Sequence, residues 1–223
     1  ECFRLWKACD AQVGDDFHIN PEEIESRYFG VLSKLFNVAR FASQFDIPND
    51  LATIPPDLEV EDKWILHEFG LLLLRVKESW NDIDIYSATQ SIKSFGTGIL
   101  ASHYLEMVKK RLYDGDEAAA WTIHRIFRDL MTIFSPVCPL FTHHVTTTIY
   151  GISAVDIDSH PLPLEILLED DLNVTDEIIA FNAMVWKAKA DAGTSLAAPI
   201  SNIKIPSQLQ RFTHILTAMH KIE

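Results

Sequence analysis

Cysteine is scarce in this 223-residue sequence, and no hydrophobic run is long. The three cysteines, Cys2, Cys9 and Cys138, form no C-x-x-C pair, which argues against a disulfide framework or a zinc knuckle and fits a reducing cytoplasm. The best apolar run, 70–76, is interrupted by Arg75 and falls short of the ~18 residues that a membrane span needs. The first ten residues are too charged for a signal peptide. We therefore expect a cytoplasmic protein with no membrane contact.

Positive charge is also in the minority. The chain has 19 Lys and Arg residues against 32 Asp and Glu residues, so its formal net charge is −13. Proteins that bind nucleic acid are usually basic over the binding face. Any nucleic-acid site here must therefore be a local basic patch on an acidic body. The acidity favours one alternative, a helical protein-interaction module that binds no RNA.

Motifs of catalysis are missing too. The sequence has no G-x-x-x-x-G-K-[ST], G-x-G-x-x-G, H-E-x-x-H or G-x-S-x-G motif, and no E-x-x-H pairs for a di-metal bundle. His143 and His144 are adjacent, so on a helix they point about 100° apart and cannot easily chelate one ion. Cys138 is interpreted as a buried core thiol. We expect no catalytic residue, metal or cofactor in these residues.

Apolar residues recur at helical spacing along most of the chain. Asn20 and Pro21 predict a helix start, because Asn20 can cap the helix and Pro21 fits its first position. Gly96 and Gly98 weaken one long helix and indicate a close helix crossing or a kink. The periodicity predicts helices over about 1–12, 21–45, 58–80, 84–112, 116–134 and 139–150.

The pattern changes after Gly151. Helices are expected at about 175–192 and 206–220, and the alternation of 200–205 predicts a short strand between them. The fold class expected is therefore mainly α. It comprises an antiparallel bundle of four or five helices, followed by a small α+β appendage.

An aromatic residue lies on the polar face of the first long helix. On a helical wheel this face carries Gly30, Lys34, Asn37, Phe41 and Gln44. Together with Arg40, these residues are of the kind that reads unpaired RNA bases, since a ring can stack, an amide can bond base edges and cations can meet phosphates. The alternative is that Phe41 packs under the proline-rich loop at 46–57 or against a neighbouring helix.

A second basic set is the run Lys109, Lys110 and Arg111 at a predicted helix end. Cations there complement the helix dipole whatever the function, so the run is a weaker candidate for contacts with an RNA backbone. Arg125 and Arg128 could extend a basic face or could pair with nearby carboxylates.

Several segments resemble the valyl-tRNA synthetases, which are class I enzymes. Residues 33–41, SKLFNVARF, resemble the Asn-Lys-Leu-Trp-Asn-Ala-Ala-Arg-Phe helix that opens their anticodon-binding domain. The ending Asn-x-x-Arg-Phe favours the valyl branch over an isoleucyl-type relative, which stays the main alternative. Departures from the pattern are Ser33, Phe36, Ser135, His143 and His144. Further similar segments, in the same order as in the family, are 3–6, 14–17, 63–66, 104–109, 134–142 and 186–199.

The resemblance implies the C-terminal anticodon-binding region of an archaeal-type enzyme. Residues 1–20 would end a stem-contact segment, 21–151 would form the anticodon-binding bundle, and 152–223 would be the small appendage. The HIGH and KMSKS signatures are absent, so these residues alone should be inactive, whereas the parent enzyme would join valine to its tRNA with ATP and Mg. The implied partners are valine tRNA and the catalytic domain of the same chain, and we expect a monomer.

The resemblance also implies roles for the two sets of residues. Lys34, Asn37, Arg40 and Phe41 would bind the anticodon loop, with the ring of Phe41 as the stacking platform. The run 109–111 would supply possible contacts with the tRNA backbone.

Overall fold

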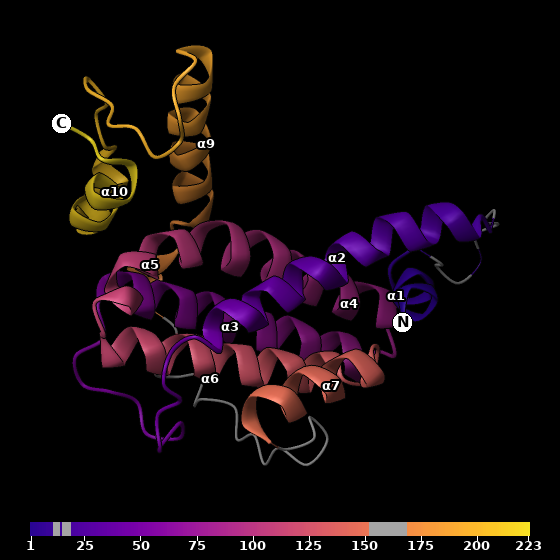
Figure 1. The fold of residues 1–223 in the computed structure, drawn as a ribbon. Helices are drawn as coiled ribbons and strands as arrows, with labels where there is room; N and C mark the ends of the chain where they lie inside the picture. Colours follow the sequence, from indigo (N-terminus) through magenta and orange to yellow (C-terminus); the bar gives the residue numbers. More distant parts are fainter. Residues whose placement is uncertain (11–13, 15–18, 152–168) are drawn as a thin grey trace.

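The structure is a computed structural model that describes residues 1–10, 14, 19–151 and 169–223. Helices dominate this part of the chain, as expected, and none of them is long and apolar enough to cross a membrane. In chain order (Figure 1) the elements are α1 (Cys2–Cys9), α2 (Pro21–Ala42), α3 (Val60–Asn81), α4 (Ile85–Ser94), η1 (Phe95–Tyr104), α5 (Leu105–Tyr113), α6 (Glu117–Phe134), α7 (Pro139–Tyr150), η2 (Asp170–Leu172), α9 (Thr175–Asp191), η3 (Ser207–Phe212) and α10 (Thr213–His220).

Helix starts follow the local sequence. The side chain of Asn20 accepts a hydrogen bond from the backbone N–H of Glu23, which confirms the predicted cap of α2. Asp116 caps α6 in the same way by accepting from the N–H of Ala119 at 2.9 Å. The turns between α3 and α4, α5 and α6, and α6 and α7 are short, so successive long helices reverse direction and pack side by side (Figure 1).

The long helix expected over 84–112 is divided by a ten-residue π-helical segment, η1. Gly96 lies in this segment, and a Cβ atom added there would come within 2.8 Å of Leu35 Cδ2 and 3.3 Å of Leu130 Cδ2. The missing side chain therefore lets α2 and α6 approach η1 closely. This confirms the predicted close helix crossing at Gly96, whereas a Cβ atom at Gly98 would meet nothing within 4 Å.

The core lies between α2, α3, η1 and α6. Its largest fully buried side chains include Tyr28, Trp64, Phe69, Phe95 and Phe127. The short helix α1 packs on α2 and α4 and adds Leu5, Trp6 and Cys9 to the same core. Cys138 is buried as well, and burial raises the pKa of its thiol, which confirms its interpretation as a core residue.

The C-terminal segment 169–223 packs on the bundle beside α3 and α5, and α9 projects away from the bundle axis (Figure 1). Hydrogen bonds tie it to α3, because Trp64 Nε1 donates to Thr175 Oγ1 at 2.8 Å and Thr175 Oγ1 donates to Glu68 at 2.6 Å.

The strand predicted at 200–205 is wrong. The described residues of the C-terminal segment form no strand, and a single parallel bridge joins Ile200 to Ile222. Asn202 adopts a left-handed conformation, with φ of 62°, which interrupts the extended backbone two residues after the bridge. The apolar alternation has a different cause, since Ile203 and Ile205 are half-buried residues packed against the core. The described part of the appendage, 169–223, is therefore helical and lacks the β part that we expected.

Candidate nucleic-acid interface

A groove between α2 and α5 brings four of the sequence-predicted residues together. Lys34, Asn37 and Phe41 from α2 and Lys109 from α5 line one hollow of about 200 Å³. We call it the α2–α5 groove. Its remaining lining is Val38, Ala101, Leu105 and Glu106. The groove thus has an apolar floor and cations from two helices, although the contributing residues are up to 75 positions apart in the sequence.

The two groove lysines are held differently. Lys34 Nζ donates a hydrogen bond to Ser102 Oγ at 2.8 Å, and Ser102 Oγ donates in turn to the carbonyl of Thr97 at 3.0 Å. These two hydrogen bonds hold the Lys34 ammonium against η1. Lys109 Nζ lies 3.6 Å from Glu106, and both side chains are about half exposed. An exposed pair of this kind contributes little to stability, so Lys109 can exchange Glu106 for another anion at little cost.

Phe41 is half-buried and belongs to a cluster of three rings. Its centroid lies 5.1 Å from that of Phe45 and 6.1 Å from that of Tyr113, and the Phe45 and Tyr113 centroids are 5.5 Å apart. All three contacts are edge-to-face, the geometry that aromatic rings favour. Phe41 therefore packs against neighbouring rings, as one of the two alternatives predicted, and it also lines the groove.

Tyr113 was missed by the sequence reasoning. It was assigned to the turn after the basic run, and periodicity alone does not show that a helix-end residue will meet rings from α2. The only available signal was its position four residues after Lys109, one helical turn further along the same face.

Two other predicted residues, Arg40 and Lys110, are exposed but do not line the groove. The backbone carbonyl of Arg40 accepts hydrogen bonds from Ser43 and Gln44 at the end of α2. Each is the sequence neighbour of a groove-lining residue, Phe41 or Lys109, and we call these two exposed positions the rim of the groove.

The side chain of Arg111 forms ion pairs with three carboxylates of the bundle. Its Nη1, Nη2 and Nε atoms lie 2.7 Å from Glu61, 2.8 Å from Asp62 and 2.8 Å from Asp116, respectively. The hydroxyl of Tyr104 donates to the other Asp62 oxygen at 2.7 Å. Burial raises the pKa of Asp62 even though Arg111 and Tyr104 act against this shift. Because each guanidinium nitrogen already faces a carboxylate, this geometry corrects the expectation that Arg111 contacts a phosphate.

Arg125 and Arg128 pair with a carboxylate, which was one of the two alternatives. Arg125 Nε lies 2.7 Å from Asp129 Oδ2, and Arg128 Nε lies 3.3 Å from Asp129 Oδ1. Arg125 is also buried and donates to the carbonyl of Leu51 at 2.7 Å. Arg125 therefore holds the 46–57 loop on α6, and neither arginine lines the groove.

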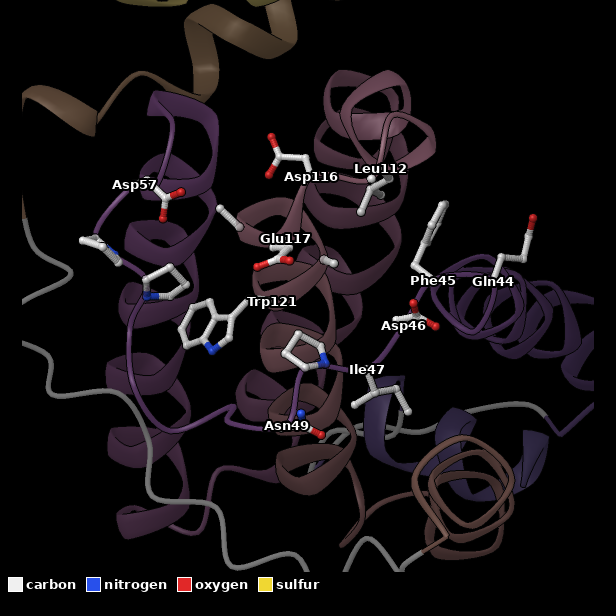
Figure 2. Close-up of a pocket in the computed structure, with 16 residues that line it drawn as sticks. Gln44, Phe45, Asp46, Ile47, Asn49, Asp57, Leu112, Asp116, Glu117 and Trp121 are labelled. Atoms are coloured by element: carbon white, nitrogen blue, oxygen red, sulfur yellow. The ribbon is translucent and has the colours of Figure 1, made fainter.

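An acid-lined hollow lies beyond the ring cluster, between the start of α6 and the loop that leaves α2 (Figure 2). It measures about 720 Å³, and no Lys or Arg is among its lining residues. Phe45 and Leu112 line it on the side of the ring cluster, and Trp121 lies on the α6 side. Its carboxylates are those of Asp46, Asp57, Asp116 and Glu117. Such a surface repels phosphate, so an RNA backbone that follows the groove is not expected to continue into this hollow.

The adjacent histidines are exposed on α7, and His144 stacks on Phe36 with centroids 6.5 Å apart. Within the described parts of the chain, no three His, Cys, Asp or Glu side chains are arranged to hold a metal ion.

A match to a known family shows the class of protein to which this helical fold belongs. The family model described as the anticodon-binding domain of tRNA ligase matches residues 62–205, and the chain belongs to this family. The match includes the α5 wall of the groove, whereas the α2 wall precedes it.

Curated relatives give the particular branch, and they confirm the resemblance to valyl-tRNA synthetases. The valine–tRNA ligase of Aeropyrum pernix is 29% identical over 235 residues, which cover 99% of this chain and 28% of the relative. The valine–tRNA ligase of Nanoarchaeum equitans is 26% identical over 224 residues, covering 100% of this chain and 28% of the relative. The valine–tRNA ligase of Sulfolobus acidocaldarius is 34% identical over 162 residues, which cover 73% of this chain and 19% of the relative. The chain therefore spans about a quarter of the length of these relatives.

Proposed function

We propose that this chain recognises the anticodon loop of valine tRNA through the α2–α5 groove, as part of a valyl-tRNA synthetase. The observation that carries the proposal is the convergence of Lys34, Asn37, Phe41 and Lys109 on one hollow. The sequence pattern and the family resemblance both indicate these residues, which come from two separate helices. The family match and the valyl relatives support tRNA as the ligand.

Each groove residue has a role that suits unpaired RNA. Lys34 and Lys109 contact backbone phosphates, and Arg40 and Lys110 add positive charge at the rim. The Asn37 amide, which carries both a donor and an acceptor, bonds to a base edge. Phe41 supplies an apolar wall against which a base can lie. The net charge of −13 repels RNA from the rest of the body, so binding concentrates at this basic patch.

The parent protein that we propose joins valine to its tRNA with ATP and Mg, in a catalytic domain outside these residues. In this proposal residues 1–20 end the stem-contact segment, 21–151 bind the anticodon and 152–223 form the appendage. The protein acts as a monomer in the cytoplasm.

Binding of anticodon stem-loops tests this function directly. We would titrate the chain with a valine stem-loop and an isoleucine stem-loop at low salt, and repeat the titrations with Lys34→Ala, Asn37→Ala and Phe41→Ala. Lys77→Ala is the matched control, because Lys77 is exposed on α3 outside the groove.

The proposal predicts tighter binding of the valine loop. Lys34→Ala should weaken the binding of both loops. It should also reduce the slope of the logarithm of the binding constant against the logarithm of the salt concentration by about 1, as expected when one phosphate contact is lost. Asn37→Ala should reduce the preference between the loops. Equal affinity for both loops would contradict the proposed preference for valine tRNA. Equal effects of Lys34→Ala and Lys77→Ala would contradict the α2–α5 groove as the binding site.

A further inference from the structure

Tyr113 is an aromatic residue that lies largely outside the core. It is the last residue of α5, and its side chain is 61% exposed, whereas its neighbour Leu112 is buried and contributes the apolar packing at this helix end. The ring nevertheless has a defined position, since Phe41 and Phe45 contact it edge-to-face at 6.1 Å and 5.5 Å. An exposed ring that two other rings hold in place is suited to accept a further flat partner.

The surroundings of Tyr113 indicate what this partner is. Phe41 and Lys109 line the basic α2–α5 groove, whereas Phe45 and Leu112 line the acid-lined hollow. Tyr113 contacts both phenylalanines and therefore stands at the boundary between the two. A strand that follows the groove reaches Tyr113 where cations give way to carboxylates. At this point the backbone must turn away, while an uncharged base can stay on the ring.

We propose that Tyr113 is the stacking platform for an unpaired base at the end of the groove, and that Phe41 and Phe45 are the positioning residues that hold its ring. This inference rests on the proposed function, which it deepens by naming a base contact that neither the sequence pattern nor the family resemblance had selected. It moves the stacking role that the resemblance implies for Phe41 to Tyr113, while Phe41, which is half-buried against other rings, remains part of the groove wall. Stacking of this kind tolerates any base, because every base has a π-face.

Substitutions at Tyr113 separate stacking from packing. Tyr113→Phe keeps the ring, Tyr113→Leu keeps apolar cover over Phe41 and Phe45 without an aromatic face, and Tyr113→Ala removes both. Phe29→Ala is the matched control. Phe29 is 63% exposed on α2, and twelve residues of helix, about 18 Å, separate it from Phe41.

The measurements are affinity for the valine anticodon stem-loop and fluorescence of the same loop with 2-aminopurine at each unpaired position in turn. We expect Tyr113→Ala and Tyr113→Leu to weaken binding roughly 5- to 150-fold, and Tyr113→Phe and Phe29→Ala to change it less than about 2-fold. One 2-aminopurine position should be quenched on binding to the natural chain and to Tyr113→Phe. At saturating protein, that quenching should disappear in Tyr113→Leu.

The outcomes distinguish this inference from the proposed function. If Lys34→Ala weakens binding and Tyr113→Leu leaves affinity and quenching unchanged, the groove stands and the stacking role of Tyr113 is overturned. If Tyr113→Leu binds normally and Tyr113→Ala lowers only the melting temperature, Tyr113 is a packing residue. If neither Lys34→Ala nor Tyr113→Ala affects binding, both the proposed function and this inference fail.

Discussion

At the scale of single residues, the run 109–111 shows how position on a helix divides three similar cations. Successive helical residues point about 100° apart, so Lys109 reaches the groove, Lys110 stays at the exposed rim and Arg111 turns into the bundle. The sequence could identify the run as basic. It could not show which member would meet Glu61 and Asp62, because these carboxylates lie about 50 positions away in α3.

The first prediction concerns Arg111. We expect Arg111→Ala to lower the free energy of unfolding by about 3–5 kcal/mol, because removal of one partner leaves buried carboxylates without their countercharge. Urea denaturation would measure this change. Lys110→Ala is the control, and it should leave the free energy of unfolding nearly unchanged. A stable Arg111→Ala variant that has lost only RNA binding would contradict the structural role.

The second prediction concerns Ile83, the residue after α3 and its cap. It has φ of 58° and is 80% exposed, although a β-branched residue in this left-handed region is unusual. The N–H of Asp84 donates to the carbonyl of Ser79 at 2.8 Å, which closes a helix C-terminal motif that favours glycine at position 83. Ile83→Gly should therefore raise the free energy of unfolding by about 0.5–1 kcal/mol.

Thermal denaturation of Ile83→Gly and Ile83→Ala would test the cause. Alanine removes the exposed aliphatic chain but keeps a Cβ atom, so it should gain less stability than glycine does. A lower melting temperature for Ile83→Gly than for the natural chain would show that relief of backbone strain at this position does not outweigh the added freedom of the unfolded chain.

At the scale of elements, helix positions followed from capping residues and apolar periodicity, and the structure confirms most of them. Asn20 and Asp116 begin the helices that their sequences predicted. The strand at 200–205 failed because alternation reports burial on one side, and a loop packed on a core can also show it. The sequence predicted only part of the η1 interruption, since Gly96 marked the helix crossing but nothing in the pattern indicated the change to π-helical hydrogen bonding.

A buried hydrogen-bond chain joins the C-terminal segment to the bundle. Asn182 of α9 lies between two histidines, with its Nδ2 2.9 Å from His103 Nδ1 and its Oδ1 2.7 Å from His220 Nε2. Burial lowers the pKa of both histidines, with smaller contributions from Lys34 for His103 and from Lys189 for His220, whose pKa falls to about 4. Both rings are therefore neutral in the folded protein at neutral pH.

The third prediction follows from these shifts. A histidine with a depressed pKa in the folded state stabilises the fold above its unfolded pKa, and this stability is lost as the pH falls toward the folded value. We expect docking of α9 and α10 to weaken between about pH 6.5 and pH 4. His220 alone would account for a loss on the order of 3 kcal/mol.

Fluorescence of Trp186 during a pH titration would follow this change, because its ring contacts both His103 and His220. His220→Gln should flatten the titration by removing one proton-binding site. His214→Gln is the control, since His214 is exposed on the same helix and should not alter the profile. An unchanged profile in His220→Gln would contradict the assignment.

At the scale of the whole molecule, an acidic body carries one groove in which cations from α2 and α5 meet an apolar floor. The sequence predicted the α2 half of this groove from a ring on a polar face. It could not predict that Lys109 would line the same groove as these α2 residues, or that three rings would form a cluster. Both features depend on how α5 packs against α2. The net charge of −13 argues against a nucleic-acid site, whereas the local cations of this groove are compatible with the site that we propose.

Footprinting of lysines would show whether RNA occupies the α2–α5 groove. The chain would be treated with an amine-acylating reagent, with and without a saturating valine anticodon stem-loop, and each modified lysine would be quantified by mass spectrometry. We expect RNA to protect Lys34 and Lys109 from acylation, while the exposed Lys77 and Lys204 react as before. Unchanged reactivity of Lys34 and Lys109 with the stem-loop bound, together with protection of lysines elsewhere, would contradict it.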